Sequence, residues 1–288
     1  MKKCKEKRKK RRTAIWAALA IFLALCIFVV WDQWNLTATQ YEIRTEKLDS
    51  PVRIVQLSDL HNREFGPDNA ALIEKVQALS PDIIAVTGDM NADDSNQKQV
   101  VFPLLKRLVH LAPVYYSLGN HEYKLDNLED FIEQIRATGT VFLDNAMVDY
   151  HVGAQTITIG GMSEYPFYDG YAPDYDNNQR HFLDAFTQEK NFKLLLCHFP
   201  EHYIWRYQEY NIDLMLAGHT HGGVVRIPFL GGMVAPNQAG LFPEYDDGLH
   251  SSDSATILIS KGLGSNFWWL PRINNPPEIT VVDLVPLE

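Results

Sequence analysis

The sequence predicts an α/β protein made of two sheets with outer helices, preceded by one long apolar helix. Three patterns indicate this class. Apolar β-branched runs alternate with helical periodicity up to about residue 140, short strand-like runs follow, and an uncharged stretch lies near the N-terminus. With 288 residues, of which 46% are apolar, the chain is long enough to form one substantial core.

The N-terminal region divides into a basic flank and an apolar stretch. Residues 1–12 contain nine Lys and Arg against one Glu, whereas residues 13–31 contain no charged side chain. As a helix, this stretch would measure roughly 28 Å, close to the hydrocarbon thickness of a bilayer. We therefore expect residues 13–31 to be a transmembrane signal-anchor, residues 32–50 to be a tether and residues 51–288 to be the folded domain.

The basic flank also predicts a direction for this anchor. Positively charged flanks stay in the cytoplasm. The N-terminus is therefore expected on the cytoplasmic side of the cell membrane and the folded domain on the extracytoplasmic side, in a single-pass protein. The competing interpretation is a cleaved signal peptide. The long apolar core and the lack of a small-x-small motif directly after it disfavour that interpretation.

The remainder of the chain is strongly acidic. The net charge is −10 overall, and since the first 12 residues carry +8, the rest carries −18. Nucleic-acid binding normally draws on a basic surface. A stable nucleic-acid partner is therefore not expected, although bound metal ions could create a local positive site.

The first half of the domain predicts a βαβαβ order, and hence a parallel sheet. A first strand is expected to start within the tether, near residues 41–44. The following strands are expected at 52–57, 83–87 and 114–118, and the helices at 69–79, 97–111 and 127–137. Gly139 provides a stop for the last of these helices.

Beyond residue 140 the chain predicts mostly short strands, with one helix at 178–187. The strand-like runs are 141–143, 147–152, 156–160, 193–197, 213–217, 224–227, 256–260 and 279–284. This change of pattern is best explained by a second sheet with its own outer helix.

Five short motifs with metal-ligating side chains follow strand-like runs. They are Asp59-Leu60-His61, Gly88-Asp89, Gly119-Asn120-His121-Glu122, Cys197-His198 and Gly218-His219-Thr220-His221. The carboxyl ends of strands are where ligand sites collect in open α/β sheets. The motifs can therefore converge in space although they lie far apart in sequence.

The spacing within these motifs suits metal ions. Alternate side chains of an extended chain share a face, so Asp59 with His61, and His219 with His221, could each hold one ion. The two oxygens of Asp89 could bridge two ions. A single buried His is more often satisfied by a backbone carbonyl, but five motifs at strand ends together indicate a two-metal site and a hydrolytic phosphoesterase.

The motifs resemble those of the calcineurin-like metallophosphoesterases, and more narrowly those of the membrane-associated YkuE-like phosphodiesterases. The likeness runs from about residue 51 to the C-terminus. The subgroup is indicated by Lys-Gly-Leu-Gly at 261–264 and Asn-Pro-Pro-Glu-Ile at 275–279. The resemblance implies a four-layer α/β/β/α sandwich of two mixed sheets.

The resemblance also implies a ligand set of seven residues. The first ion would be held by Asp59, His61 and His221, the second by Asn120, His198 and His219, and Asp89 would bridge both. The expected cofactors are two divalent metal ions, and Mn, Fe and Zn all tolerate mixed nitrogen and oxygen ligands.

Such a centre predicts hydrolysis of a phosphodiester by attack of a metal-bound hydroxide, because two adjacent cations acidify water and offset charge on phosphorus. His121 is the candidate general acid, with a structural hydrogen bond as its alternative role. Arg63 is a candidate contact to the substrate phosphate, with a surface salt bridge as the simpler explanation. Glu122 is expected either to orient a histidine or to be a solvated loop carboxylate.

Three functions remain open at this point. A phosphodiesterase would act on a lipid-linked or envelope-derived phosphoester substrate. The same ligands permit a phosphomonoesterase or pyrophosphatase acting on a nucleotide-linked lipid precursor. The third is a non-catalytic metal-phosphate binding module, which the intact Asp89 and His121 disfavour.

The apolar side chains at 267–270 are expected either to meet the bilayer or an acyl chain, or to pack under the C-terminal strand.

Overall fold

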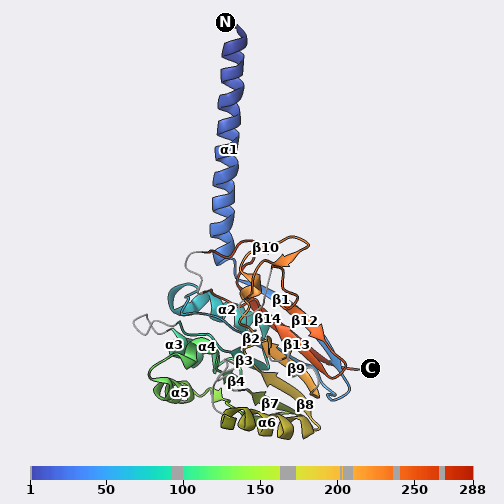
Figure 1. The fold of residues 1–288 in the computed structure, drawn as a ribbon. Helices are drawn as coiled ribbons and strands as arrows, with labels where there is room; N and C mark the ends of the chain where they lie inside the picture. Colours follow the sequence, from blue (N-terminus) through green and yellow to red (C-terminus); the bar gives the residue numbers. More distant parts are fainter. Residues whose placement is uncertain are drawn as a thin grey trace.

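The chain folds into two six-stranded sheets that pack face to face, with helices on the outside (Figure 1). The computed structural model describes residues 2–92, 100–162, 173–201, 203, 210–235, 241–265 and 270–287. Helices cover the outer face of each sheet, so the layers follow the order α/β/β/α. The predicted four-layer sandwich of mixed sheets, preceded by one long apolar helix, is confirmed.

The first sheet contains the βαβαβ unit expected from the sequence. In spatial order its strands are β1 (Thr37–Thr45), β14 (Glu278–Pro286), β2 (Val52–Leu57), β3 (Ile83–Thr87), β4 (Val114–Ser117) and β5 (Val141–Phe142). Strands β2 to β5 run parallel, whereas β14 is antiparallel to β2. The outer face is covered by α2 (Ala70–Leu79), which follows the short η1 (Pro67–Asn69), and by α3 (Val101–Leu108) and α5 (Leu128–Ala137).

The second sheet is formed by the C-terminal half of the chain. In spatial order its strands are β12 (Gly248–Ser251), β13 (Ala255–Ile259), β9 (Ile212–Ala217), β8 (Phe192–Leu196), β7 (Gln155–Gly161) and β6 (Ala146–Val152). The four central strands run parallel and both edge strands are antiparallel. Helix α6 (Pro173–Gln188) covers the outer face.

The alternation of side chains along each strand separates the apolar cores. In β2, Ile54 belongs to the cluster between the two sheets, whereas Val55 and Leu57 belong to the cluster beneath the outer helices. Leu194 and Leu214 close the inter-sheet core from the second sheet. This two-residue period, together with burial on both faces, explains why these strands are almost continuously apolar in sequence.

The expected membrane-spanning stretch lies within α1 (Lys2–Trp34), a helix of 33 residues. It is long and apolar enough to cross a membrane by length and composition, and the rest of the described chain does not bury it. Figure 1 shows α1 extending away from the two sheets and their outer helices, which together are called the body. The helix extends beyond residues 13–31 on both sides because the basic flank continues the same helical backbone.

About half of the stretch expected as a tether is a strand of the first sheet, and it includes the strand expected near residues 41–44. β1 pairs in parallel with β14, from Thr37 opposite Glu278 to Thr45 opposite Pro286. Its Tyr41 also packs against the inter-sheet core. Only residues 35 and 36 separate α1 from β1, so the helix joins the body through a very short connection.

Several elements differ from the sequence expectation, including β12, which was not expected, and α3, which ends at Leu108 rather than at residue 111. The strand expected at 224–227 is reduced to β10 (Arg226–Ile227), paired with β11 (Gly231–Gly232), because Val224 has a φ of 59° after the short η3 (His221–Gly223). Helix α6 is longer than the expected 178–187. Of the apolar cluster at 267–270, residues 267–269 lie outside the described residues.

Removal of β1 is expected to destabilise the body. A chain that starts at residue 51 loses the partial burial of Leu36, Tyr41 and Ile43. At about 1 kcal/mol for each half-buried side chain, the melting temperature should fall by roughly 6 to 12 °C. A chain that starts at residue 32 keeps these contacts and is the control. Thermal unfolding followed by circular dichroism measures the difference, and equal melting of the two chains would contradict the role of β1.

Candidate metal centre

All five motifs lie at one edge of the sandwich. Asp59 follows β2, Asp89 follows β3, and Asn120 opens the short helix α4 (Asn120–Tyr123) after β4. From the second sheet, His198 follows β8 and His219 follows β9. Parallel strands end at the same edge of a sheet, and here two such edges meet. The side chains of Asp59 and His221, which are 162 positions apart, are thereby brought within 3.8 Å of each other.

Five of the candidate ligands have a left-handed backbone. The φ angles are 54° for Asp59, 48° for His61, 51° for Asp89, 70° for His219 and 50° for His221. Such angles are uncommon outside glycine and persist only where the surroundings enforce them. Here the N–H groups of Asp59 and His61 donate to carbonyl groups of the neighbouring loop at 3.0 Å. Each loop therefore turns sharply where its strand ends.

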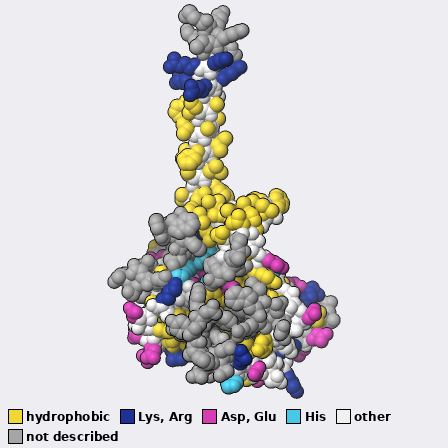
Figure 2. Space-filling view, viewed as in Figure 1, with side chains coloured by type: hydrophobic (Ala, Val, Ile, Leu, Met, Phe, Trp, Pro, Cys, Tyr) yellow, Lys and Arg dark blue, Asp and Glu magenta, His cyan; other side chains and the backbone are white. Residues whose placement is uncertain are grey.

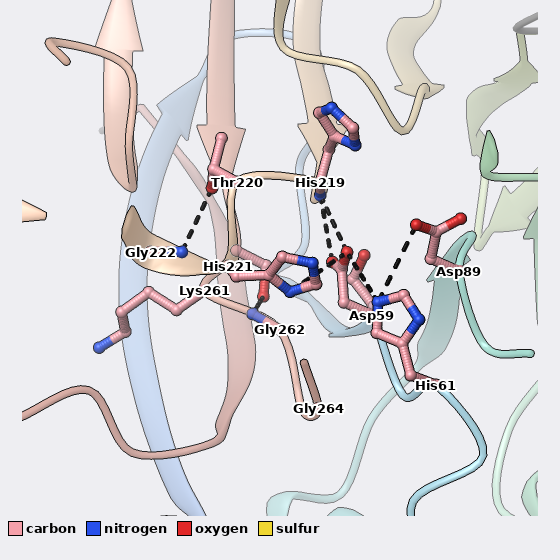
Figure 3. Close-up of polar contacts among 12 residues, drawn as sticks. Asp59, His61, Asp89, His219, Thr220, His221, Gly222, Lys261, Gly262 and Gly264 are labelled. Atoms are coloured by element: carbon pink, nitrogen blue, oxygen red, sulfur yellow. Dashed lines mark hydrogen bonds and ion pairs between the residues drawn. The ribbon is translucent and has the colours of Figure 1, made fainter. Parts of the chain in front are cut away.

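Asp59 lies at the centre of the first group of donors (Figure 3). Its Oδ1 is 4.0 Å from Nε2 of His61 and 3.8 Å from Nδ1 of His221. The backbone N–H of His219 donates to both carboxylate oxygens, at 3.1 and 3.2 Å. One donor atom from each of Asp59, His61 and His221 lies within 4.8 Å of the other two, so the three could hold a metal ion.

Asp89 belongs to two further groups of this kind. One contains His198 and His219, and the other contains His61 and His121. Oδ2 of Asp89 is 3.1 Å from Nε2 of His198, 3.7 Å from Nε2 of His121 and 4.0 Å from Nε2 of His61. Because Asp89 and His61 each belong to two groups, the donors form one continuous centre.

The hydrogen bonding of His198 shows that a cation fits this centre. Its Nδ1 lies 2.7 Å from the carbonyl oxygen of Thr87, which can only accept, so Nδ1 carries a proton. A neutral ring then presents the Nε2 lone pair to the Asp89 carboxylate 3.1 Å away, an arrangement that requires a proton or a cation beside both atoms. Oδ1 of Asn120 is also buried, without a hydrogen-bond partner among the described residues.

Burial determines how the acidic and basic groups of the centre ionise. It raises the pKa of Asp59 to about 6. Burial also penalises the charge of Asp89, but the surrounding histidines, His198 foremost, outweigh it and hold the pKa of Asp89 well below its usual range. Burial lowers the pKa of His219 and His221 well below the usual value. Both rings are therefore neutral and offer the lone pairs that a metal ion requires.

Glu122 has a role that the sequence did not indicate. It is fully buried rather than solvated. Its carboxylate accepts hydrogen bonds from backbone N–H groups of two loops rather than from a histidine. Oε2 accepts from the N–H groups of Asp89 and Gly119 at 2.8 and 2.9 Å. Oε1 accepts from the N–H of Asn91 at 3.0 Å and from the hydroxyl of Tyr116 at 3.1 Å. One carboxylate thus fixes the loops after β3 and β4 together.

A loop from the C-terminal part of the chain closes around Asp59. Gly262 has a φ of 73°, and a Cβ at this position would lie 2.6 Å from Cβ of Asp59. The N–H of Leu263 donates to the Ser58 carbonyl at 3.0 Å, and the N–H of Gly264 donates to the Asp59 carbonyl at 2.6 Å. Only glycine allows this approach at position 262. The motif at 261–264 therefore belongs to the frame of the metal centre.

Arg272 holds this loop in place through hydrogen bonds, and Asn275 bonds to the neighbouring loop that contains His221. Arg272 is fully buried, and its guanidinium donates to the carbonyl groups of Gly264, Lys261 and Asn275 at 2.7 to 2.8 Å. Burial lowers the pKa of Arg272 to about 10. The side-chain amide of Asn275 donates to the His221 carbonyl at 2.7 Å. Arg272 lies outside every motif and Asn275 opens the motif at 275–279, but the role of each depends on contacts with distant backbone that the sequence does not show.

His121, the expected general acid, lies within the donor groups. Its ring meets that of His61 edge-on with 4.7 Å between ring centroids, and its backbone N–H donates to Oδ1 of Asp89 at 2.8 Å. The ring is therefore held beside the Asp89 carboxylate.

Arg63, the expected contact to the substrate phosphate, packs against the end of α1. Its guanidinium lies 4.7 Å from the ring centroid of Trp34 and 5.0 Å from that of Phe65, and it donates to the Gln33 carbonyl. Burial lowers the pKa of Arg63 to about 10. These contacts tie the loop after His61 to the N-terminal helix.

Buried Asp and His donors at the strand ends of a double-sheet sandwich define a metal-dependent phosphoester hydrolase. Comparison with known proteins supports this class. The family model for calcineurin-like phosphoesterases matches residues 52–223. The chain is 30% identical to the metallophosphoesterase YkuE of Bacillus subtilis, over 81% of this chain and 78% of that protein. It is 29% identical to the phosphodiesterase YaeI of Escherichia coli, over 82% of this chain and 83% of that protein.

The chain belongs to the calcineurin-like phosphoesterase family. This confirms the resemblance found in the motifs, including the YkuE-like subgroup. Among solved structures, a dimetal phosphatase from Danio rerio matches with a TM-score of 0.46 and 11% identity, over 74% of this chain and 88% of that chain. The family assignment rests on the family model and on the sequence relatives.

The substitution Glu122→Gln is expected to loosen the metal centre. The amide group would face backbone N–H donors, leaving buried groups unpaired, and the free energy of unfolding should fall by about 2 to 4 kcal/mol. Urea denaturation of the chelator-treated protein measures this effect. The control is Glu133→Gln on the exposed face of α5. If both variants unfolded like the parent chain, the bracing role of Glu122 would be wrong.

Proposed function

We propose that this chain is a membrane-anchored phosphodiesterase that uses two divalent metal ions. The observation that carries the proposal is the continuous group of buried donors from both sheets, with Asp89 shared between two of its subgroups. A site for one metal ion would not need a carboxylate that belongs to two groups of donors.

In this proposal the seven donors divide between two ions. The first ion is held by Asp59, His61 and His221, the second by Asn120, His198 and His219, and Asp89 is a ligand of both. The division is supported by the separate groups around Asp59 and around Asp89 with His198. It is also supported by the buried Oδ1 of Asn120, for which the described residues supply no partner. The geometry does not favour one of Mn, Fe or Zn.

The chain contributes positioning and proton transfer to the reaction. When bound, the two ions lower the pKa of a water molecule and offset the negative charge of the phosphate. The left-handed loops and the Glu122 carboxylate hold the donors in place before substrate arrives. His121 donates a proton to the leaving oxygen, and its backbone bond to Asp89 directs the ring into the centre.

A phosphodiester is the preferred substrate class. YaeI, a relative of this chain, is named as a phosphodiesterase. The charge of the body, −18 outside the basic flank, also disfavours a dianionic monoester relative to a monoanionic diester. The phosphomonoesterase and pyrophosphatase alternatives would use the same metal ligands. They differ from the phosphodiesterase in the negative charge of the substrate that the site must accept.

The membrane topology is part of the same proposal. Residues 13–31 span the cell membrane, residues 1–12 lie in the cytoplasm, and the catalytic domain lies on the extracytoplasmic side. The basic flank and the apolar helix support this arrangement. The stretch at 32–50 connects the span to the domain at 51–288 and includes β1.

The full chain, purified in detergent and supplied with Mn²⁺, is expected to hydrolyse an aryl phosphodiester faster than the matching aryl phosphomonoester. The diester carries less negative charge than the monoester, so the acidic body repels it less. Release of the aryl alcohol is followed by absorbance, with chelator-treated protein as the control. A dominant monoester rate would favour the phosphomonoesterase alternative instead.

The variant His121→Ala is expected to keep both ions and to lower kcat by about 10² to 10⁴, because it removes the proton donor and no ligand. The variant Asp89→Asn should lose activity together with one or both ions. Elemental analysis beside the diester assay separates the two effects. His151→Ala, on the exposed side of β6, is the matched control. Unchanged turnover in the first two variants would contradict the mechanism.

A further inference from the structure

An exposed apolar surface lies at the end of the body from which α1 rises. We define the hairpin face as Ile227, Phe229, Leu230, Leu241 and Phe242. Phe229 is fully exposed, and Leu230 and Leu241 are 60% and 63% exposed. Figure 2 shows hydrophobic side chains gathered around the base of α1 and extending to one side, with histidine side chains just below them.

Backbone hydrogen bonds join the two segments of the hairpin face into one surface. The N–H of Met233 donates to the Val225 carbonyl at 2.8 Å, which closes the β10–β11 hairpin. The N–H of Phe242 then donates to the Met233 carbonyl at 3.0 Å. The segment at 241–242 therefore lies directly beside the hairpin.

The hairpin continues directly from the metal-centre loop. His221 begins η3, and β10 starts at Arg226, five positions later. The Arg226 guanidinium donates to the Gly222 carbonyl at 3.0 Å and pairs with Asp246 at 2.9 Å. The N–H of Val234 donates to the Gly223 carbonyl at 3.3 Å. The hairpin face is thus fixed in position relative to a proposed metal ligand.

The same loop is bonded to the end of the membrane helix. Asp32, the first residue after the apolar stretch, is buried, and its carboxylate accepts from the backbone N–H of Asn275 at 2.8 Å. The side chain of Asn275 donates to the His221 carbonyl. Trp31 and Trp34, which flank Asp32, are 56% and 60% exposed, as is typical of residues at a membrane interface. One residue therefore connects the metal-centre loop to the point where the chain leaves the bilayer.

The charge of this end of the body also suits a membrane. Residues 227–235 and 241–243 contain no charged side chain, although the body as a whole is strongly acidic. Arg226, which precedes the first of these segments, is neutralised by Asp246 and Asp247. Figure 2 shows most Asp and Glu side chains of the visible face lower on the body, away from α1.

We propose that the hairpin face inserts into the interface of the same bilayer that α1 spans, so that the metal centre faces the lipid headgroups. The substrate is then a phosphodiester carried by a membrane lipid. The bilayer is the occupant because the face is continuous with the end of the anchor helix, through the contacts of Asn275. This inference rests on the proposed anchored phosphodiesterase and adds the source of its substrate.

The test uses the full chain in phosphatidylcholine vesicles, with two substrates that share one reacting group. One is a soluble aryl phosphodiester, and the other is an aryl phosphodiester of diacylglycerol embedded in the same vesicles. The test variant is Phe229→Ser with Leu230→Ser. The control is Leu287→Ser, a 48% exposed leucine whose N–H bonds to Thr45, at the far end of β1 from the helix.

The double variant should hydrolyse the embedded lipid about tenfold more slowly than the parent chain, because two large apolar side chains no longer enter the interface. Hydrolysis of the soluble diester should not change, and the Leu287→Ser control should match the parent on both substrates. An unchanged ratio of the two rates in the double variant would overturn the inference. So would a detergent-stable oligomer that the double variant dissociates, because the hairpin face would then bind a second copy.

Two other results would identify a failure of the proposed function instead. If the parent chain did not float with the vesicles, the membrane anchor would be wrong. If it hydrolysed neither substrate, the proposed phosphodiesterase activity would be wrong, and the inference would fall with it. A parent chain that hydrolyses only the soluble diester would overturn the lipid substrate alone.

Discussion

The structure depends on placing two carboxylates, Asp59 and Asp89, side by side in the buried interior. Burial of either charge costs several kcal/mol unless positive or donating groups compensate it. Backbone N–H groups and histidine rings surround both carboxylates. The Nε2 lone pair of His198 nevertheless faces Asp89 across 3.1 Å. A pair of divalent cations, as in the proposed function, would satisfy all these groups together.

The remaining features of the site keep those loops in an unfavourable backbone conformation. Left-handed φ angles at five candidate ligands are tolerated because Glu122 binds the loops after β3 and β4, and because Gly262 permits a close approach to Asp59. Arg272, which is fully buried, fixes the loop that contains Gly262. The candidate metal centre is therefore supported by residues that are not among the seven proposed ligands and that lie outside the five motifs or at their margin.

The N-terminal helix is integrated into this frame rather than loosely attached. β1 lengthens the first sheet, Asp32 bonds to Asn275, and Arg63 stacks on Trp34. A helix that spans a bilayer would therefore hold the metal centre at a defined height above the membrane. The placement of α1 relative to the candidate metal centre is thus set by the fold itself, since only residues 35 and 36 separate α1 from β1.

The sequence by itself determined the layers, the βαβαβ order, the long apolar helix and the strand-end motifs. Those features depend on local periodicity and on residue type, both of which are readable along the chain. Tertiary structure decided the rest. The sequence indicated a strand near residues 41–44, but its full extent, Thr37–Thr45, and its pairing with β14, more than 200 residues away, depend on the tertiary structure. Glu122, Arg272 and Asn275 gained their roles, and Arg63 its place at α1, through contacts with distant backbone and rings. Such contacts leave no periodic signal, because they depend on which loops the folded sheets bring together.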